Sequence, residues 1–187
     1  IYHASGASAL SVLTDGPYFD GRIEYLQQTR AAVPLPILRK DFMIGLYQIY
    51  ESRAVGTDAI LLIGEILEPP LLADMLDLAF GLGMTSLIEV HSRETLDRVH
   101  ETVQFPNNKR CLLGINNRDL KIQKTDLATT ERLAGDIPKG TIIISESGIK
   151  THADVQRLIR AGVHGLLIGE TLMRAPDIAL AIRELFG

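Results

Sequence analysis

The chain repeats one pattern seven times: a short apolar run suited to a β-strand, a polar residue near the end of that run, and an amphipathic stretch suited to a helix. Each run begins 23 to 30 residues after the previous one, which is the length that one strand, one helix and two short loops occupy. This alternation predicts an α/β fold with parallel strands. The seven runs are residues 9–14, 36–42, 59–67, 85–91, 111–118, 141–147 and 165–170.

The composition of the runs favours a closed barrel. The segments ILLI, LLGI, TIII and GLLI are nearly continuous aliphatic stretches, as expected for strands whose two faces are both covered. An open, doubly wound sheet has the same alternation, but seven evenly spaced units favour the (β/α)8 TIM barrel. A complete barrel needs eight units and about 250 residues, whereas this chain has 187. We therefore expect one domain over residues 1–187, with seven βα units present and the first strand missing.

The stretches between the runs carry helix signals. Pro69 and Pro70 precede one stretch, Ser92 another and Thr151 a third, and these residue types favour the first positions of helices. Gly6 is expected to close the tail of a helix, because glycine readily adopts the left-handed conformation that ends helices. The predicted helices are residues 21–33, 46–55, 69–82, 92–104, 125–135, 151–161 and 176–186.

Charge and hydropathy exclude several classes of partner. The net charge is −4 and there is no basic cluster of the kind that a phosphate backbone requires, so we expect no binding to nucleic acid. The longest apolar run contains Gly64 and Glu65 and is shorter than the roughly 18 residues of a membrane span. The first residues also lack the basic and apolar blocks of a signal peptide. We expect a cytoplasmic protein in which Cys111 is a small core residue.

Two charged residues interrupt the apolar runs. Lys40 lies in PILRKDF and Glu89 in TSLIEVH, where an unpaired charge is costly to remove from water. Side chains alternate along a strand, so Leu38 shares a side with Lys40, and Leu87 with Glu89. If these sides face the barrel axis, a cation and a carboxylate project into one mouth. A buried ion pair without a catalytic role explains the pattern equally well, and both interpretations stay open.

Two further segments end strands with residues suited to anion binding. In GINNRDL, Asn116 supplies a donor and an acceptor, and Arg118 can bind a carboxylate or phosphate with two donors, although an Asn-rich turn is a common alternative. Gly148 and Gly169 lie at the ends of the last two runs, where barrels commonly bind phosphate through backbone N–H groups. As isolated glycines they would be ordinary turn residues, but their position after the last two strands favours phosphate.

The sequence contains no recognisable metal or nucleotide motif. The five histidines are scattered without the spacing of ligands, and neither HExxH nor GxGxxG nor a P-loop occurs. We therefore expect a reaction without cofactor or metal on a small phosphorylated substrate.

In their order and spacing, several segments closely resemble the indole-3-glycerol phosphate synthase family. The resemblance covers essentially all 187 residues and implies a TIM barrel that converts 1-(2-carboxyphenylamino)-1-deoxyribulose 5-phosphate to indole-3-glycerol phosphate in tryptophan biosynthesis, with loss of carbon dioxide and water. Its most specific part is the combination of ILRKDF, LIEVH and INNRDL. The other matching segments are SVLTDGPYFDG, ISESGI and LIGETLMRA.

The resemblance also implies roles for individual residues. Lys40 matches the general acid that protonates the ketone oxygen, and Glu89 matches its acid/base partner during dehydration. Asn116 matches an amide that orients the substrate, Arg118 a contact on the phosphate side or at the barrel mouth, and Ser147 a supporting polar group. The remaining matches are Gly148 and Gly169 in the phosphate cradle, Leu61 and Phe42 as apolar walls for the anthranilate ring, and Leu13 and Phe19 as further contributors to those walls.

Two departures from the family pattern stand out. The family's first strand, with a Glu, a Lys and a Ser-Pro motif, would lie before Ile1, and the helical extension that covers the barrel mouth would lie there too. Glu170 occupies a position in the phosphate loop where some relatives have serine, although the backbone N–H can still bind an anion.

Three alternatives to an active synthase stay open at this point. Two are related phosphate-binding barrels, phosphoribosylanthranilate isomerase and the tryptophan synthase α subunit. The third is an inactive, truncated barrel that only folds or self-associates, because an open barrel has two unpaired strand edges. The complete protein is expected to be a monomer that binds a small phosphorylated molecule.

Overall fold

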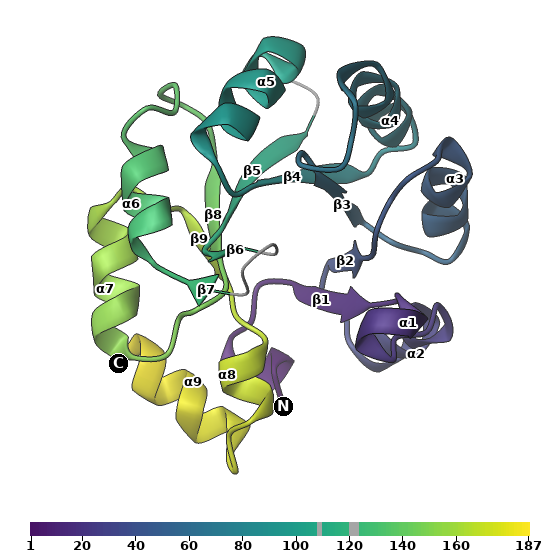
Figure 1. The fold of residues 1–187 in the computed structure, drawn as a ribbon. Helices are drawn as coiled ribbons and strands as arrows, with labels where there is room; N and C mark the ends of the chain where they lie inside the picture. The colour runs from purple at the N-terminus through teal and green to yellow at the C-terminus, as the bar shows by residue number, and fades with distance from the viewer. Residues whose placement is uncertain (108–109, 120–123) are drawn as a thin grey trace.

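The main sheet contains seven parallel strands that follow one another in chain order. The structure is a computed structural model that describes residues 1–107, 110–119 and 124–187. The sheet curls around a central axis with the helices outside it (Figure 1), which confirms the predicted TIM-barrel class with seven βα units. The strands pair in the order β1 (Leu10–Leu13), β2 (Ile37–Lys40), β3 (Ala59–Ile63), β4 (Thr85–Val90), β5 (Cys111–Asn116), β8 (Ile143–Glu146) and β9 (Gly165–Leu167).

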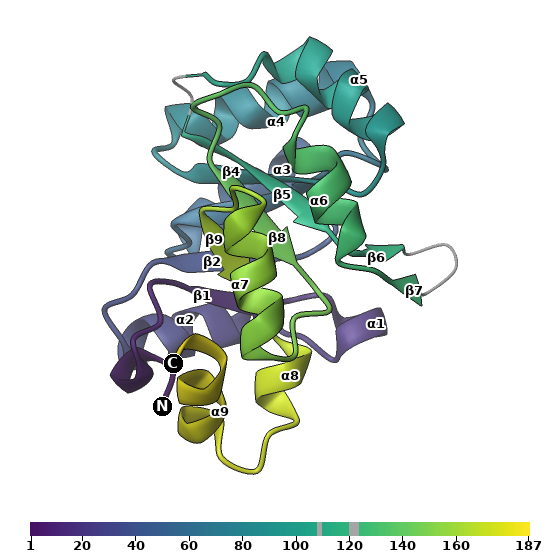
Figure 2. The ribbon, with the colours of Figure 1, turned by 90° about the vertical axis from the view of Figure 1, so that its left-hand side faces the viewer.

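Helices cover the outer face of this sheet (Figure 2). All seven predicted helices are present with slightly shorter ends, and the expected helix tail before Gly6 is a 3-10 turn, His3–Ser5, closed by Gly6 at φ 89°. The short helix α1 (Gly16–Phe19) was not predicted, and the short helix α8 (Glu170–Met173) begins directly after Gly169. The predicted ones are α2 (Glu24–Ala32), α3 (Leu46–Ala54), α4 (Pro69–Gly81), α5 (Arg93–Val103), α6 (Ala128–Ala134), α7 (His152–Arg160) and α9 (Ile178–Phe186).

The expected start signals cap their helices. The Ser92 hydroxyl accepts a hydrogen bond from the Thr95 N–H at 3.1 Å, which satisfies one of the free donors at the start of α5. At α7, the Thr151 hydroxyl accepts from the Asp154 N–H at 3.2 Å, while the Asp154 carboxylate accepts from the Thr151 N–H at 2.9 Å. This reciprocal pair is a capping box. Each strand is therefore followed by a helix that begins at a defined residue.

The strands alternate between two apolar environments. Ile60 and Ile88 belong to the cluster between the sheet and the helices, whereas Leu61 and Leu87, next to them in the chain, face the inside of the barrel with Leu38. All five side chains are buried. This period of two places every second residue of β2, β3 and β4 on the inner face. Polar side chains that follow Leu38 and Leu87 by two residues therefore point to the inside as well.

Arg39 and Lys40 are neighbours in β2 and point to opposite faces. Arg39 is 4% exposed and reaches outward, where its guanidinium donates to Glu51 of α3 at 2.8 Å and to Asp41 at 2.9 Å. These bonds attach β2 to α3, since a buried cation needs partners of opposite charge. Arg39 is thus held in structural ion pairs on the outer face, whereas Lys40 points to the inside of the barrel.

The prediction of one strand over residues 111–118 was wrong at the end of this segment. β5 stops at Asn116, and β6 (Arg118–Asp119) instead pairs antiparallel with β7 (Lys124–Thr125). Figure 2 shows this hairpin beyond the end of the main sheet. Asn117 lies between β5 and β6. Its side chain donates to the Glu146 and Ser147 carbonyls at 3.0 and 3.1 Å, which attaches this turn to the end of β8. Arg118 therefore lies on a hairpin rather than on a barrel strand.

The helices carry no sign of a membrane segment. Within the described ranges, each helix is too short or too polar to span a bilayer.

Candidate active site

Three charged side chains converge at the carboxyl ends of the inner strands. The Lys40 ammonium of β2 lies 3.3 Å from Glu89 Oε2 of β4 and 3.3 Å from Glu146 Oε2 of β8. The two carboxyl side chains are almost fully buried, at 4% and 2% exposure, whereas the Lys40 side chain keeps 25%. Because the Lys40 ammonium is partly exposed between two buried carboxyl groups, a ligand at the mouth of the barrel can contact it.

Asn116 fixes the orientation of Glu89. Its side-chain amide donates to Glu89 Oε1 at 3.0 Å, and its side-chain oxygen accepts from the Arg118 N–H at 3.0 Å. Both oxygens of Glu89 are thus bonded, one to an amide and the other to Lys40. The predicted residues Lys40, Glu89 and Asn116 therefore form one connected group.

The pKa values of Lys40 and Glu146 are both raised, for different reasons. For Lys40, burial works against the charged form, but the charges of Glu146 and Glu89 and their hydrogen bonds outweigh it and raise its pKa. For Glu146, burial is the main cause and Glu89 adds to it, while Lys40 opposes them, so that the pKa rises to about 7. Lys40 therefore stays charged, and Glu146 can exchange a proton near neutral pH.

Glu146→Gln is expected to flatten the pH dependence of stability between pH 4.5 and 7. Because the folded protein holds the Glu146 pKa at about 7, above the ordinary 4.5, the folded state binds more protons than the unfolded state in this window. The free energy of unfolding then falls as the pH rises through the window, and glutamine cannot titrate. Urea unfolding of both proteins across this range measures the difference.

Glu131→Gln serves as the matched control for this experiment. Glu131 is a surface residue of α6 whose pKa is lowered by its hydrogen bond to Arg157, so its titration lies below the window. The control should keep the slope of the wild-type protein. An unchanged slope in Glu146→Gln would contradict the proton uptake assigned to Glu146.

Glu146 was not predicted as a site residue. A signal was present, because Glu146 ends the apolar run TIIISE in the same way that Glu89 ends TSLIE. His91 was not predicted as a site residue either. Its Nδ1 atom contacts the Asn116 carbonyl at 2.8 Å, and its Nε2 atom contacts Asp119 at 3.3 Å. His91 thus connects β4 to the end of β5 and to the hairpin that carries Arg118.

The segments predicted to hold phosphate lie side by side. The Thr171 hydroxyl donates to the Ile149 carbonyl at 2.6 Å, which joins the loop after β8 to the first turn of α8, where Gly169 is the residue before the helix. Ser147 and Gly148 both have positive φ values, 67° and 78°. A side chain at Gly148 would overlap Thr125 of β7, so this glycine is required for close approach of the hairpin.

Arg118 and Glu170 form an ion pair near these segments. Arg118 Nη2 donates to Glu170 Oε2 at 2.7 Å, and Arg174 donates to the other oxygen of Glu170 at 3.0 Å. The Arg118 and Arg174 guanidinium groups hold the pKa of Glu170 below its usual range. The Glu170 carboxylate is therefore balanced by two cations.

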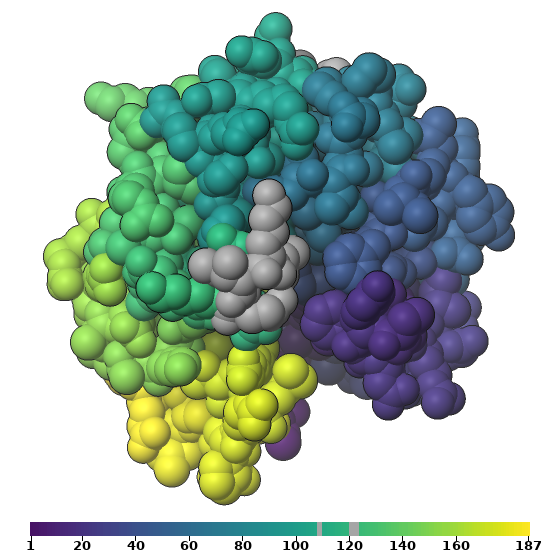
Figure 3. Space-filling model, in the orientation of Figure 1, coloured from purple at the N-terminus to yellow at the C-terminus, as the bar shows by residue number. Residues whose placement is uncertain are grey.

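The predicted apolar residues gather on the opposite side of the strand series. Leu61 and Phe42 share the cluster inside the barrel, and Leu13 pairs in register with Lys40, which places it on the same inner face. Phe19 packs on Phe42 with ring centroids 6.3 Å apart, and Tyr18, which the sequence analysis did not single out, makes an edge contact with Phe42 at 5.7 Å. In Figure 3 the purple residues of this region and the yellow residues of α8 lie on the same face.

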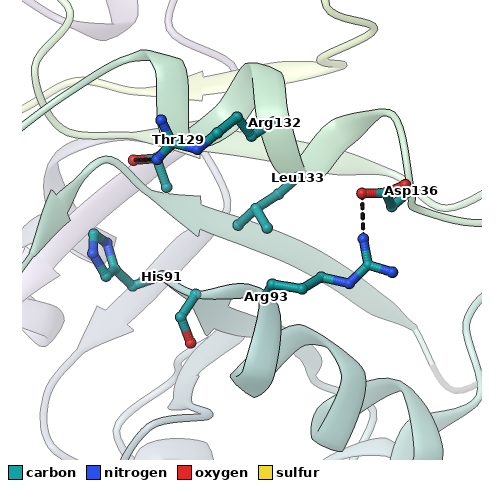
Figure 4. Close-up of a pocket in the computed structure, with 7 residues that line it drawn as sticks. His91, Arg93, Thr129, Arg132, Leu133 and Asp136 are labelled. Carbon is teal, nitrogen blue, oxygen red and sulfur yellow. Dashed lines mark hydrogen bonds and ion pairs between the residues drawn. The ribbon is translucent and has the colours of Figure 1, made fainter.

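A cavity of about 400 Å³ lies between α5 and α6, outside this group of residues (Figure 4). It is lined by Arg93 and Arg132, but Arg93 is already paired with Asp97 and Asp136. Both of these ion pairs are exposed to solvent, and Lys40, Glu89 and Glu146 do not line this cavity. We therefore place the candidate site at the Lys40 cluster. Among the described residues there is no group of three histidine, cysteine or acidic side chains suited to a metal ion.

Comparison with known proteins decides the family. The model of the family described as indole-3-glycerol phosphate synthase matches residues 1–185. This chain belongs to the indole-3-glycerol phosphate synthase family. The match decides against the two related barrels, phosphoribosylanthranilate isomerase and the tryptophan synthase α subunit. The phosphate loops after the last two strands could not distinguish these families from one another.

Several curated proteins named indole-3-glycerol phosphate synthase are similar to the whole chain. The protein from Rhodospirillum rubrum is 47% identical over 186 residues, which cover 100% of this chain and 69% of that relative. The proteins from Rhodopirellula baltica and Albidiferax ferrireducens are 48% and 49% identical, and the chain covers 70% and 68% of their lengths.

Solved structures with low sequence identity share the fold alone. The 3-hexulose-6-phosphate synthase of Salmonella typhimurium superposes with a TM-score of 0.75 at 12% identity, over 94% of this chain and 83% of that one. A native KDPGal structure gives a TM-score of 0.66 at 15% identity, over 98% and 82%. These likenesses support the barrel and carry no information on the reaction.

Proposed function

We propose that Lys40, Glu89 and Glu146 carry out the chemistry of an indole-3-glycerol phosphate synthase in this protein. The enzyme is a carbon–carbon lyase of tryptophan biosynthesis that closes the indole ring of 1-(2-carboxyphenylamino)-1-deoxyribulose 5-phosphate. The single observation that supports the assignment of these residues is the ammonium of Lys40, which lies 3.3 Å from each of two buried carboxyl groups at the mouth of the barrel.

Lys40 acts first, as the general acid. When the aromatic carbon attacks the ketone, negative charge develops on the ketone oxygen, and an ammonium within reach both stabilises and protonates that oxygen. The carboxylate on the ring then leaves as carbon dioxide, and its electron pair is accepted by the cationic centre that ring closure created. The two carboxyl partners keep Lys40 charged for this step, since they raise its pKa despite burial.

Glu89 acts in the dehydration that follows. Loss of the new hydroxyl as water requires a proton on that oxygen, and forming the double bond of the five-membered indole ring requires removal of a proton from carbon. Glu89 lies two residues after the buried Leu87, is oriented by the Asn116 amide at 3.0 Å, and has its other oxygen 3.3 Å from Lys40. Glu146, with a pKa of about 7, can supply or accept a proton beside it.

The two ends of the substrate are assigned to the two sides of the mouth. We place the phosphate at Gly148, Gly169 and the Arg118 side, where Ser147 supports the loop. The apolar ring belongs against Phe42 and Leu61, with Leu13 and Phe19 beside them. Glu170 is expected to shape the phosphate end through its bonds to Arg118 and Arg174. With the ring and the phosphate held on opposite sides, the ketone lies over Lys40.

We further infer a cytoplasmic, monomeric enzyme whose phosphate-binding barrel domain includes residues 1–187 and whose ligand is this small phosphorylated molecule. Lys40, Glu89 and Glu146 all come from one chain, so the proposed chemistry requires no second copy. Size-exclusion chromatography of the full-length protein should give a monomer, and a stable dimer would contradict this inference.

Indole-3-glycerol phosphate fluorescence tests the proposed reaction. The full-length protein should form this product from the phosphorylated substrate without an added cofactor. The same substrate without its phosphate should show a KM about 100-fold higher, the effect of losing one or two charge-assisted hydrogen bonds. Absence of product would overturn the reaction, whereas equal KM values would overturn only the assignment of the phosphate end.

A further inference from the structure

Gly114 lies in β5 between the strands that carry the two carboxyl groups. It pairs in register with Glu89 of β4 and with Ile144 of β8. Ile144 faces the inside of the barrel, and a side chain at position 114 would point inward as well. The missing side chain therefore leaves a space on the inner face, one step below the level of Asn116.

The carboxyl group of Glu146 occupies this space. A Cβ atom at position 114 would overlap Glu146 Oε1 and would lie 3.2 Å from Leu87 Cδ1, which is tight on that side too. Within the part of the chain that the structure describes, Glu146 Oε1 has no hydrogen-bond partner, and the residue is 1% exposed. Oε1 therefore lies in the space above Gly114 without a bond, while the other end of the carboxyl group interacts with Lys40 and Glu89.

The backbone gives no reason for glycine at this position. Gly114 is a paired strand residue without the positive φ value that glycines such as Gly148 have. Glycine inside a strand weakens it, and where it occurs it often marks the close approach of another group. Here the approaching group is the carboxyl of Glu146.

We propose that Gly114 is a positioning residue, whose absent side chain allows the Glu146 carboxyl to stay buried against β5 and within reach of Lys40. The inference rests on the proposed roles of Lys40 and Glu146. Any larger residue would push this carboxyl toward the mouth and change its distance from the ammonium. Gly114 touches no substrate in this arrangement and acts only through Glu146.

The test compares Gly114→Ala with Gly165→Ala in the full-length protein. Gly165 of β9 pairs in register with Ile144, and a side chain there would meet only the flexible end of Ile144 at 2.8 Å. Gly114→Ala is expected to lower kcat by on the order of 100-fold with a change in KM of less than about threefold, because a shift of about 1 Å in a catalytic group has effects of this size. Gly165→Ala should stay within about threefold of wild type for both constants.

The pH profile of kcat separates positioning from general damage to the fold. The groups that face Glu146 are Lys40 and Glu89, and both remain in Gly114→Ala. A carboxyl group that is pushed toward the mouth is more exposed to water, which lowers its pKa. The inflection of the kcat profile that belongs to Glu146 should therefore move to lower pH. A variant that is only less stable would lose active protein without moving this inflection.

A double-mutant cycle with Glu146→Ala covers the case in which Gly114→Ala folds poorly. Removing the Glu146 carboxyl removes the overlap, so Gly114→Ala should cause no further loss of kcat in that background and the midpoint of thermal unfolding should recover. Equal losses in both backgrounds would overturn the inference. The inference would also be overturned if Gly114→Ala kept the wild-type rate while Glu146→Gln was inactive. Full activity of Glu146→Gln would instead overturn the proposed role of Glu146.

Discussion

Lys40→Met is expected to abolish turnover, by on the order of 1000-fold or more, while the protein stays folded. The substitution removes both the proton donor and the positive charge beside the ketone oxygen, and each typically contributes 100-fold or more. Methionine fills much of the same space. Glu89 and Glu146 then lose their shared cation, but one proton between them relieves their repulsion. Single-turnover fluorescence and circular dichroism on the same preparation measure both effects.

Arg39→Met is the matched control for this experiment. Arg39 is adjacent in the chain, carries the same charge and points to the opposite face, where it is 4% exposed and paired with Glu51 and Asp41. Its removal should cost about 3 kcal/mol of stability, because the carboxylates of Asp41 and Glu51, at 12% and 31% exposure, lose their cation, while the folded fraction keeps its kcat. If Lys40→Met behaved like this control, Lys40 would be a structural ion-pair residue and the proposed mechanism would fail.

Glu89→Gln is expected to lower kcat by about 100-fold to 10,000-fold with little change in KM. Glutamine has nearly the same size, and its oxygen can still accept a hydrogen bond from Lys40, so binding is largely kept. It can neither release nor take up the proton that dehydration requires. Steady-state kinetics over a range of substrate concentrations separate the two constants.

Glu65→Gln is a suitable control for Glu89→Gln. Glu65 lies near the end of the neighbouring strand β3, and its carboxylate accepts from the His91 N–H at 2.6 Å, a bond that the oxygen of glutamine can also accept. The kcat of Glu65→Gln should stay within about threefold of wild type, since the Glu65 carboxylate is bonded to the backbone of His91. A maximal rate that Glu89→Gln leaves unchanged would remove Glu89 from the mechanism.

Much of the fold could be predicted because burial on both faces leaves a clear trace in a strand. The runs ILLI and TIII are nearly continuous, and helices such as α5 and α7 begin at the residues that can cap them. The hairpin of β6 and β7 could not be predicted in the same way. The chain leaves the sheet because the Asn117 side chain binds carbonyls of residues about 30 positions away, and such long-range bonds have no local pattern.

Part of the candidate site could likewise be predicted from local sequence patterns, and part could not. Lys40 and Glu89 could be found because a charge two residues after a buried leucine must point to the same side of its strand. Glu146 similarly follows an inner-face residue, Ile144, by two positions, but Gly148 nearby favoured a phosphate loop in this segment. The space that Gly114 leaves for Glu146 involves two strands, so neither strand alone indicates it.

The amino-acid sequence by itself determined the alternation of strands and helices and the face on which each inner side chain lies, because both follow from local periodicity and burial. Only the tertiary structure decided that Lys40 shares its ammonium between Glu89 and Glu146, which are 49 and 106 residues further along the chain. The curvature of the sheet brings these strand ends together, and a low-dielectric interior then couples their charges. The pKa values of the cluster are therefore a property of the folded barrel.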